Sequence, residues 1–152
     1  MHRGTSRPCE SSALIDTLFS APAVGFSVKV PKKSTTSGQL SFQYVITNEG
    51  QGYDTDTGLF TCPVPGFYYF SASLFKRYTS GSVYCNLETN TSYTRLYVLS
   101  GSEGGKGYLA LGNSFYVHLD AGETVKLSLC TAAATFDSLS TFSGFLVSPD
   151  SI

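Results

Sequence analysis

The sequence contains no tryptophan, one methionine and two histidines, and charged residues occupy only 14% of its 152 positions. Ten basic residues stand against eleven acidic ones, for a formal net charge of −1. A nucleic-acid partner, which is held mainly through neutralisation of its phosphates, is therefore not expected. No apolar run approaches the roughly 20 residues of a membrane-spanning helix, so we expect a soluble chain with no membrane span and no signal peptide.

Residues that could carry catalysis are also few. His118 is the only histidine outside the N-terminal segment, and no serine, cysteine or aspartate near it has the spacing of a nucleophile motif. The carboxylate pairs Asp54–Asp56 and Asp120–Glu123 would support glycoside hydrolysis only if the fold held them at a set separation. On turns between strands, such pairs usually cap the backbone instead. We therefore predict that the chain is not an enzyme.

The cysteines are few and widely spaced, which excludes a paired-ligand zinc site. Four cysteines can pair in three ways in an oxidising compartment or remain as buried thiols, and we favour the oxidised form. The strands that carry two of them, Cys85 and Cys130, could be antiparallel neighbours at a separation that suits a bridge. Cys9, in the N-terminal segment, is then free for a link between chains. The four positions are Cys9, Cys62, Cys85 and Cys130.

Glycine, tyrosine and phenylalanine are abundant, at 15, 10 and 11 residues, and this composition favours strands and turns over helices. From Val24 onward, short apolar segments alternate with clusters of Gly, Ser, Thr, Asn and Asp, without a sustained apolar stripe at helical spacing. About ten strands at this spacing predict an all-β sandwich of two antiparallel sheets. We expect residues 1–20 to form a partly disordered arm and residues 21–152 to form one domain.

Two segments carry further information about the sheets. Residues 115–119 and 125–129 alternate between apolar and polar on either side of the polar turn 120–123, which predicts a hairpin. Residues 66–70 are apolar at every position except the first glycine, as in a strand that is buried between two layers. Two prolines just before them cannot donate to a sheet, so they mark the start of this strand.

A longer pattern in the middle of the chain is more specific than composition. Aromatic residues, an asparagine and a segment Gly-x-Tyr-x-Phe recur at intervals that resemble the signature of the complement C1q-like globular domain. A second segment near residue 145 resembles the closing strand of that family, and the matches together span residues 24–149. The last position of the pattern departs from the family, because Ala72 stands where an aromatic is usual. The matching residues are Phe42, Asn48, Tyr53, Phe60, Gly66, Tyr68, Phe70, Phe142, Gly144 and Phe145.

This resemblance implies a ten-stranded jelly roll of the C1q and tumour-necrosis-factor type, assembled as a homotrimer, secreted, and acting by binding. It also implies a disulfide between Cys62 and Cys85, because complement members join the cysteine before the Pro-Gly turn to one on the next strand. The pairing of Cys85 with Cys130 remains the alternative from the residues themselves. The chain has no Gly-X-Y repeat, so bundling through a collagen stalk is not expected.

Several relatives bind calcium near the trimer apex through a loop and a Gly-Tyr-Leu-Asp-like segment. Here Ala110 fills the acidic position of that segment, and the loop before it offers Glu103 as its only carboxylate. Asp54 and Asp56 form the other oxygen-rich turn. Because calcium takes about six to eight oxygen ligands, we expect no bound cofactor, and these three carboxylates are the only candidates for a calcium site.

Tyrosines in or beside predicted loops are candidates for a binding surface, since their flat rings contact sugars and proteins well. Two basic residues beside them could meet an anionic sugar or a lipid headgroup. Asn90 opens an N-glycosylation sequon. Together with the absence of catalytic residues, the resemblance implies a recognition domain for microbial or self glycans, lipopolysaccharide or proteins in innate immunity. An extracellular-matrix trimerisation module and a cytokine-like receptor ligand are the alternatives. The candidate ligand-binding residues are Tyr78, Tyr93, Tyr97, Tyr108, Lys76 and Arg77.

Overall fold

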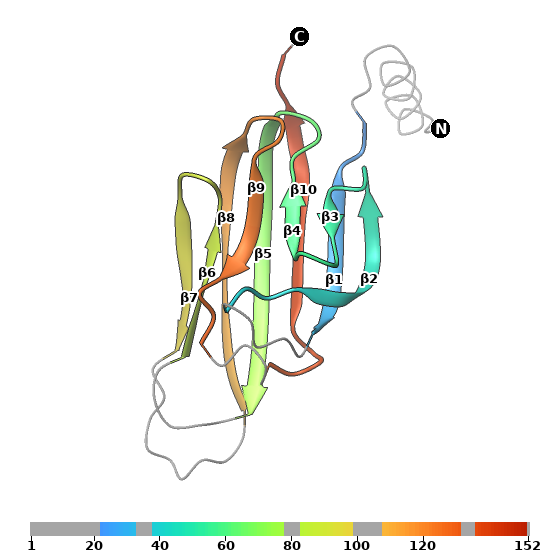
Figure 1. Ribbon diagram of the computed structural model, residues 1–152. Coiled ribbons are helices and arrows are strands. Elements are labelled where there is room, and N and C mark those ends of the chain that lie inside the picture. The colour runs from blue at the N-terminus through green and yellow to red at the C-terminus, as the bar shows by residue number, and fades with distance from the viewer. Residues whose placement is uncertain (1–21, 33–37, 78–82, 99–107, 132–135, 152) are drawn as a thin grey trace, which may run out of the picture.

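The computed structural model describes residues 22–32, 38–77, 83–98, 108–131 and 136–151. These ranges contain ten strands and no helix, so none that could cross a membrane. The strands form two five-stranded sheets, which lie one over the other (Figure 1). The strands are β1 (Gly25–Pro31), β2 (Phe42–Glu49), β3 (Tyr53–Asp54), β4 (Leu59–Thr61), β5 (Gly66–Arg77), β6 (Val83–Glu88), β7 (Tyr93–Val98), β8 (Tyr108–Leu119), β9 (Thr124–Ser128) and β10 (Thr141–Pro149).

The first sheet has the strand order β2-β1-β10-β5-β8 and the second has the order β3-β4-β9-β6-β7. All the strand pairings within them are antiparallel. The prediction of a ten-stranded all-β sandwich is therefore confirmed. The predicted N-terminal arm, residues 1–20, lies outside the described residues, and Cys9, Tyr78 and Glu103 lie outside them as well.

Aromatic side chains from both sheets interlock in the core. The ring of Phe26 on β1 lies 5.0 Å from that of Tyr53 and 5.3 Å from that of Phe60, which belong to the other sheet. Such contacts add to the gain from burying apolar area. Of the aromatic residues in the family pattern, all but Phe145 are buried. The buried ones are Phe42, Tyr53, Phe60, Tyr68, Phe70 and Phe142.

Gly144 of β10 occupies a position where the core leaves no room for a side chain. A Cβ atom there would lie 2.2 Å from Cδ1 of Phe70 and 3.1 Å from Cε1 of Phe26. We expect Gly144→Ala to lower the free energy of unfolding by about 1–3 kcal/mol, through overpacking, in urea titrations. Gly112→Ala is the control, since its Cβ would approach only the backbone of β5, at 3.0 Å or more. A larger loss at Gly112 than at Gly144 would contradict this account.

The predicted hairpin of residues 115–119 and 125–129 is wrong. β8 pairs with β5 in the first sheet, whereas β9 pairs with β4 and β6 in the second. The turn between them carries the chain from one sheet to the other, and it is held beside β4 by two backbone hydrogen bonds. The Gly122 amide donates to the Cys62 carbonyl, and the Cys62 amide donates to the Glu123 carbonyl, both at 2.8 Å. Alternation identifies the buried face of a strand but not its partner.

Residues 66–70 differ from the expectation in a way that bears on function. Tyr68 and Phe70 are fully buried, but Phe67 and Tyr69 between them are 39% and 38% exposed. The segment therefore has one face in the core and an apolar face that the described residues leave partly exposed. A strand that is apolar on both faces is expected to be buried on both. The sequence does not tell whether residues of the same chain or of another molecule bury the second face.

Candidate binding surfaces

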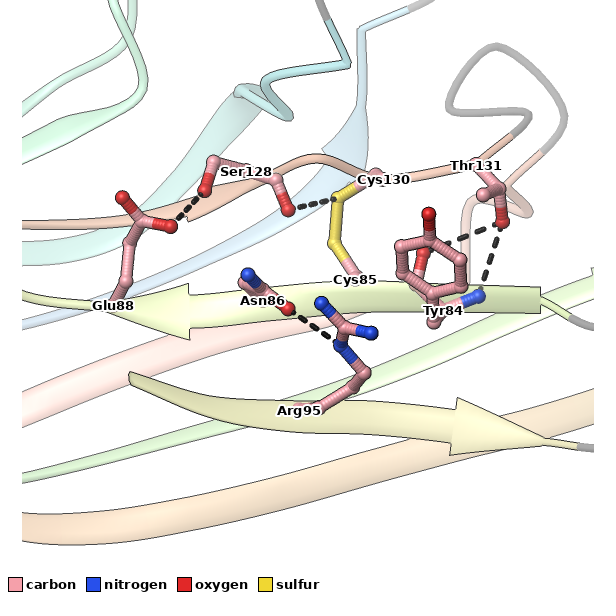
Figure 2. Close-up of a disulfide and its surroundings, with 8 residues drawn as sticks. All are labelled: Tyr84, Cys85, Asn86, Glu88, Arg95, Ser128, Cys130 and Thr131. Carbon is pink, nitrogen blue, oxygen red and sulfur yellow. Dashed lines mark hydrogen bonds between the residues drawn. A yellow bond between two sulfur atoms is a disulfide. The ribbon is translucent and has the colours of Figure 1, made fainter. Parts of the chain in front are cut away.

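The disulfide joins Cys85 to Cys130, so the bridge between Cys62 and Cys85 is wrong (Figure 2). Cys85 lies on β6, and Cys130 follows β9, which is the neighbour of β6 in the second sheet. Cys62 follows β4, and β9 separates β4 from β6. The alternative drawn from neighbouring strands is therefore confirmed, because sheet adjacency decides which cysteines come within bonding distance.

Cys62 is a buried free thiol whose sulfur donates a hydrogen bond to the Val64 carbonyl at 3.2 Å. Burial raises the pKa of this thiol above its ordinary value. Because the thiolate is the reactive form, we expect iodoacetamide to modify Cys62 much more slowly in the native protein than in urea at the same mildly alkaline pH. Peptide mapping of the alkylated protein measures this. Equal rates in the two states would contradict the burial of Cys62.

The first sheet presents an apolar face to the outside of the sandwich, which we call the apolar face. On β5 and β8 the rings of Phe67 and Tyr116 stack, with centroids 5.2 Å apart. On β5 and β10 the rings of Tyr69 and Phe145 lie 6.0 Å apart. Exposed patches of this kind mark interaction sites in soluble proteins. The exposed apolar side chains that the register places on this face are Tyr44, Phe67, Tyr69, Tyr116 and Phe145.

A row of small hydroxyl side chains crosses the apolar face beside the aromatic residues. It is formed by register partners on five adjacent strands. At one end of the row, a hollow of about 330 Å³ opens between β1, β2 and β10, with Gly25 and Phe145 in its lining. The apolar face therefore combines a ridge of large rings with a trough of small side chains. The residues of the trough are Thr47, Ser27, Ser143, Ser71 and Ser114.

His118 lies on the same face, at the end of β8. Its ring meets that of Phe67 edge-on at 5.1 Å between centroids. Its Nε2 atom lies 2.9 and 3.0 Å from the two carboxylate oxygens of Asp150, and its Nδ1 atom lies 3.9 Å from Asp120. These contacts tie the segment after β10 to β8. His118 therefore lies on the surface of a strand, bound to carboxylates at the end of the sheet.

A second exposed cluster lies on the outer side of the second sheet, and we call it the tyrosine–arginine cluster: Tyr84, Tyr93, Arg95 and Tyr97. Tyr93 and Tyr97, both predicted as ligand-binding residues, are 62% and 52% exposed. Between them on β7, the guanidinium carbon of Arg95 lies 4.4 Å from the ring centroid of Tyr84 and 5.9 Å from that of Tyr93. The Nε atom of Arg95 donates a hydrogen bond to the Asn86 side-chain oxygen at 2.8 Å (Figure 2).

Sequence reasoning missed Tyr84 and Arg95. The alternation of Tyr93, Arg95 and Tyr97 around buried Leu96 would have placed these three residues on one exposed face. Tyr84 joins them only through the register of two strands, since it stands opposite Tyr97. That relation is not readable from a single sequence.

The other predicted ligand-binding residues do not join this cluster. Lys76 is only 1% exposed, because the alternation of β5 directs it inward, and burial lowers the pKa of its ammonium group. The expected surface position of Lys76 is therefore wrong. The backbones of Arg77 and Tyr108 are register partners on β5 and β8, but their side chains lie outside the described part of the structure.

Two of the candidate carboxylates, Asp54 and Glu123, act as caps of turns. The Asp54 Oδ1 atom accepts a hydrogen bond from the Asp56 amide at 2.8 Å. The Glu123 Oε1 atom accepts one from the Asp120 amide at 2.7 Å. Within the described ranges, no group of three or more His, Cys, Asp or Glu side chains is placed to hold a metal ion. The absence of a cofactor remains a prediction.

Asn90 is exposed in the turn between β6 and β7. Its side-chain oxygen accepts a hydrogen bond from the Thr124 amide at 2.8 Å. The turn lines a shallow hollow of about 210 Å³ beside Tyr93. The sequon is thus placed on the surface, and its glycosylation remains a prediction.

Comparisons with known proteins agree with this architecture. The mouse collagen alpha-1(X) chain is 34% identical over 135 residues, which make up 84% of this chain and 19% of that protein. Caprin-2 of Danio rerio is 32% identical over 118 residues, which make up 76% of this chain and 13% of that protein. This chain therefore spans less than a fifth of the length of these curated relatives.

Solved structures show the same fold. The globular domain of zebrafish complement 1qA protein superposes with a TM-score of 0.68 at 19% identity, covering 86% of this chain and 100% of that one. Murine APRIL, in a crystal structure at pH 5.0, superposes with a TM-score of 0.62 at 10% identity, covering 82% of this chain and 99% of that one. The sequence model of the C1q domain matches residues 25–147. The chain therefore belongs to the C1q domain family.

Proposed function

We propose that this chain is a secreted, non-catalytic recognition domain that assembles as a homotrimer and binds microbial or self ligands, namely glycans, lipopolysaccharide or proteins, in innate immunity. The observation that carries the proposal is the apolar face of the first sheet. Its rings are too exposed for a chain that works alone in water, since contiguous apolar surface of this kind favours association. Family membership supports binding rather than catalysis.

The shape of the apolar face favours a ring of copies. The ridge, with Tyr69 and Tyr116, and the hollow beside Ser27 and Ser143 lie on different parts of one sheet. When a ridge on one copy meets a trough on the next, the contact is head-to-tail, and such contacts form a ring when the rotation between copies closes. Three copies make the smallest such ring. Three weak ligand sites that act together then raise the avidity of the assembly.

The chemistry of the chain supports an extracellular setting. The buried bridge between Cys85 and Cys130 is of a kind that persists in oxidising compartments and is rare in the cytosol. One carboxylate of each pair considered for hydrolysis, Asp54 and Glu123, accepts a backbone hydrogen bond within its turn. Both observations fit a durable binding module outside the cell.

Solution mass tests the assembly. Light scattering and sedimentation of the full chain are expected to give three times the 16.3-kDa chain mass, unchanged by a chelator. A glycan array and a lipopolysaccharide-binding assay on the same sample test the ligand class. A folded protein with the mass of one chain across micromolar concentrations would overturn the proposed assembly, and a trimer without ligands on either assay would overturn recognition.

A second candidate function is a structural trimerisation module. It is favoured by the similarity to the mouse collagen alpha-1(X) chain, which is a collagen. In that case assembly is the function, and the trimer would bind none of the tested glycans. Localisation of the protein to a matrix rather than to body fluid would favour this candidate.

A further inference from the structure

The guanidinium group of Arg95 is held in one place before any ligand arrives. Its Nε atom donates a hydrogen bond to the side chain of Asn86, a residue that is only 4% exposed. Its central carbon lies 4.4 Å from the ring centroid of Tyr84. The backbone carbonyl of Arg95 accepts a hydrogen bond from the Asn113 side chain at 3.1 Å, which ties β7 to β8. A long side chain fixed in this way loses little further entropy when it binds a partner.

The positive charge of Arg95 meets the rings of Tyr84 and Tyr93, but it is not paired with a carboxylate within the described part of the chain. Glu88, an acidic residue of β6 on the same face, accepts a hydrogen bond from Ser128 at 2.5 Å and lies 3.9 Å from the ammonium of Lys126. No ion pair to Arg95 occurs among the described residues. Figure 2 shows Arg95 reaching from β7 toward Asn86 and Tyr84, while Glu88 and Ser128 pair with each other farther along β6. The terminal nitrogens of Arg95 are therefore available to a carboxylate in bidentate geometry.

The surroundings of Arg95 fit a sugar better than a peptide or an inorganic anion. Tyr93 and Tyr97 flank Arg95 on β7 and present exposed rings, which suit the apolar face of a pyranose. Beside Tyr93, the hollow of about 210 Å³ is lined mainly by hydroxyl and amide side chains, which suit sugar hydroxyls. Within that turn, the Thr89 hydroxyl oxygen accepts hydrogen bonds from the Thr91 and Ser92 amides at 3.1 and 3.0 Å, so the lining is ordered.

The tyrosine–arginine cluster also remains open in the proposed assembly. It lies on the outer side of the second sheet, whereas the apolar face lies on the outer side of the first sheet. Copies that join through the apolar face therefore leave the cluster exposed on each chain. We propose that the tyrosine–arginine cluster binds a carboxylate-bearing sugar, with the carboxylate on Arg95 and the sugar ring on Tyr93 or Tyr97. The inference rests on the proposed recognition function and names its ligand class.

Calorimetric titration of the assembled full chain tests this inference with two probes, sialyllactose and an oligogalacturonate. They represent the two sources of a sugar carboxylate, a terminal sialic acid and a chain of uronic acids. Lactose and the methyl-esterified oligogalacturonate are the matched probes without a charged carboxylate. We expect at least one acidic probe to bind and its uncharged counterpart to bind about 10- to 100-fold more weakly, because a hydrogen-bonded charge is lost.

Variants locate the site. Arg95→Gln is expected to weaken binding of the acidic probe by about 10- to 100-fold, and Arg95→Lys is expected to lose most of this affinity although the charge is kept. Lys126→Gln is the control: it removes one positive charge from the same face without touching Arg95, and we expect the affinity to stay within about twofold.

The outcomes separate this inference from the proposed function. Binding to one or both acidic sugars that is lost in Arg95→Gln supports the site and identifies the source of the carboxylate. Absence of binding to both probes, or equal binding by Arg95→Gln, overturns it. Equal binding to a polyglutamate peptide or to dextran sulfate also overturns it, in favour of general anion binding. The mass of each sample is measured alongside, so a trimer that binds other glycans but neither probe refutes the inference and leaves the proposed function standing.

Discussion

Tyr116→Glu is expected to convert the proposed trimer into single folded chains. Tyr116 is 58% exposed in the chain and lies at the centre of the ridge, stacked on Phe67 and opposite Tyr69 in the register of β5 and β8. In the assembly, each copy would bury one uncompensated carboxylate, at a cost of about 3–5 kcal/mol per charge. Within the single chain the same side chain faces water, so the fold itself loses little.

Light scattering and circular dichroism on the same samples check this expectation. The mass should fall to that of one chain while the strand signal is unchanged. Thr61→Glu is the control, because Thr61 is exposed on β4 in the second sheet, away from the apolar face. A Tyr116→Glu protein that keeps the full mass would show that copies do not meet through this face. Loss of mass in Thr61→Glu would place the contact on the other sheet.

Removal of the bridge between Cys85 and Cys130 has the second large expected effect. The bridge joins residues 45 positions apart, and closing a loop of that length is worth roughly 4 kcal/mol of unfolding free energy in the chain-entropy description. The double variant Cys85→Ala, Cys130→Ala is therefore expected to unfold at a much lower urea concentration. Unfolding is followed by tyrosine fluorescence at one fixed chain concentration, because assembly also contributes to stability.

Reductant provides an internal check on the bridge. It should destabilise the wild-type protein by about the same amount as the double substitution and leave the double variant unchanged. Cys62→Ala is the control, and reductant should still destabilise it, because its bridge is intact. If reductant had no effect on the wild type, or if peptide mapping found Cys62 joined to Cys85, the strand order of the second sheet would be wrong at β9.

The candidate sites show which features a sequence can predict. Tyr93 and Tyr97 were predicted because tyrosines beside loops of Asn, Thr and Ser are typical of binding surfaces, and both are exposed. Lys76 was placed on the surface because it is charged. It is buried instead, because it lies at one of the alternate positions of β5 whose side chains point into the core. Arg95 was not predicted as a binding residue, because the contacts that hold its guanidinium group come from Tyr84 and Asn86 on the neighbouring strand. Contacts across strands depend on register, which a single sequence does not state.

Local features of the sequence determined the class of this protein. Alternation of period two, turn residues at short intervals and the recurring aromatic pattern specified an all-β sandwich of about ten strands, because each of these signals acts over a few neighbouring residues. The aromatic positions of the family pattern, from Phe42 to Phe142, therefore reached the core as expected.

Only the tertiary structure decided which strands are neighbours. It placed β9 between β4 and β6, and so joined Cys85 to Cys130 and left Cys62 free. It separated β8 from β9 and left the rings on one side of β5 partly exposed among the described residues. The physical reason is that the pairing of distant strands depends on how two whole sheets pack and close, whereas a strand's own residues specify only its buried face and its ends.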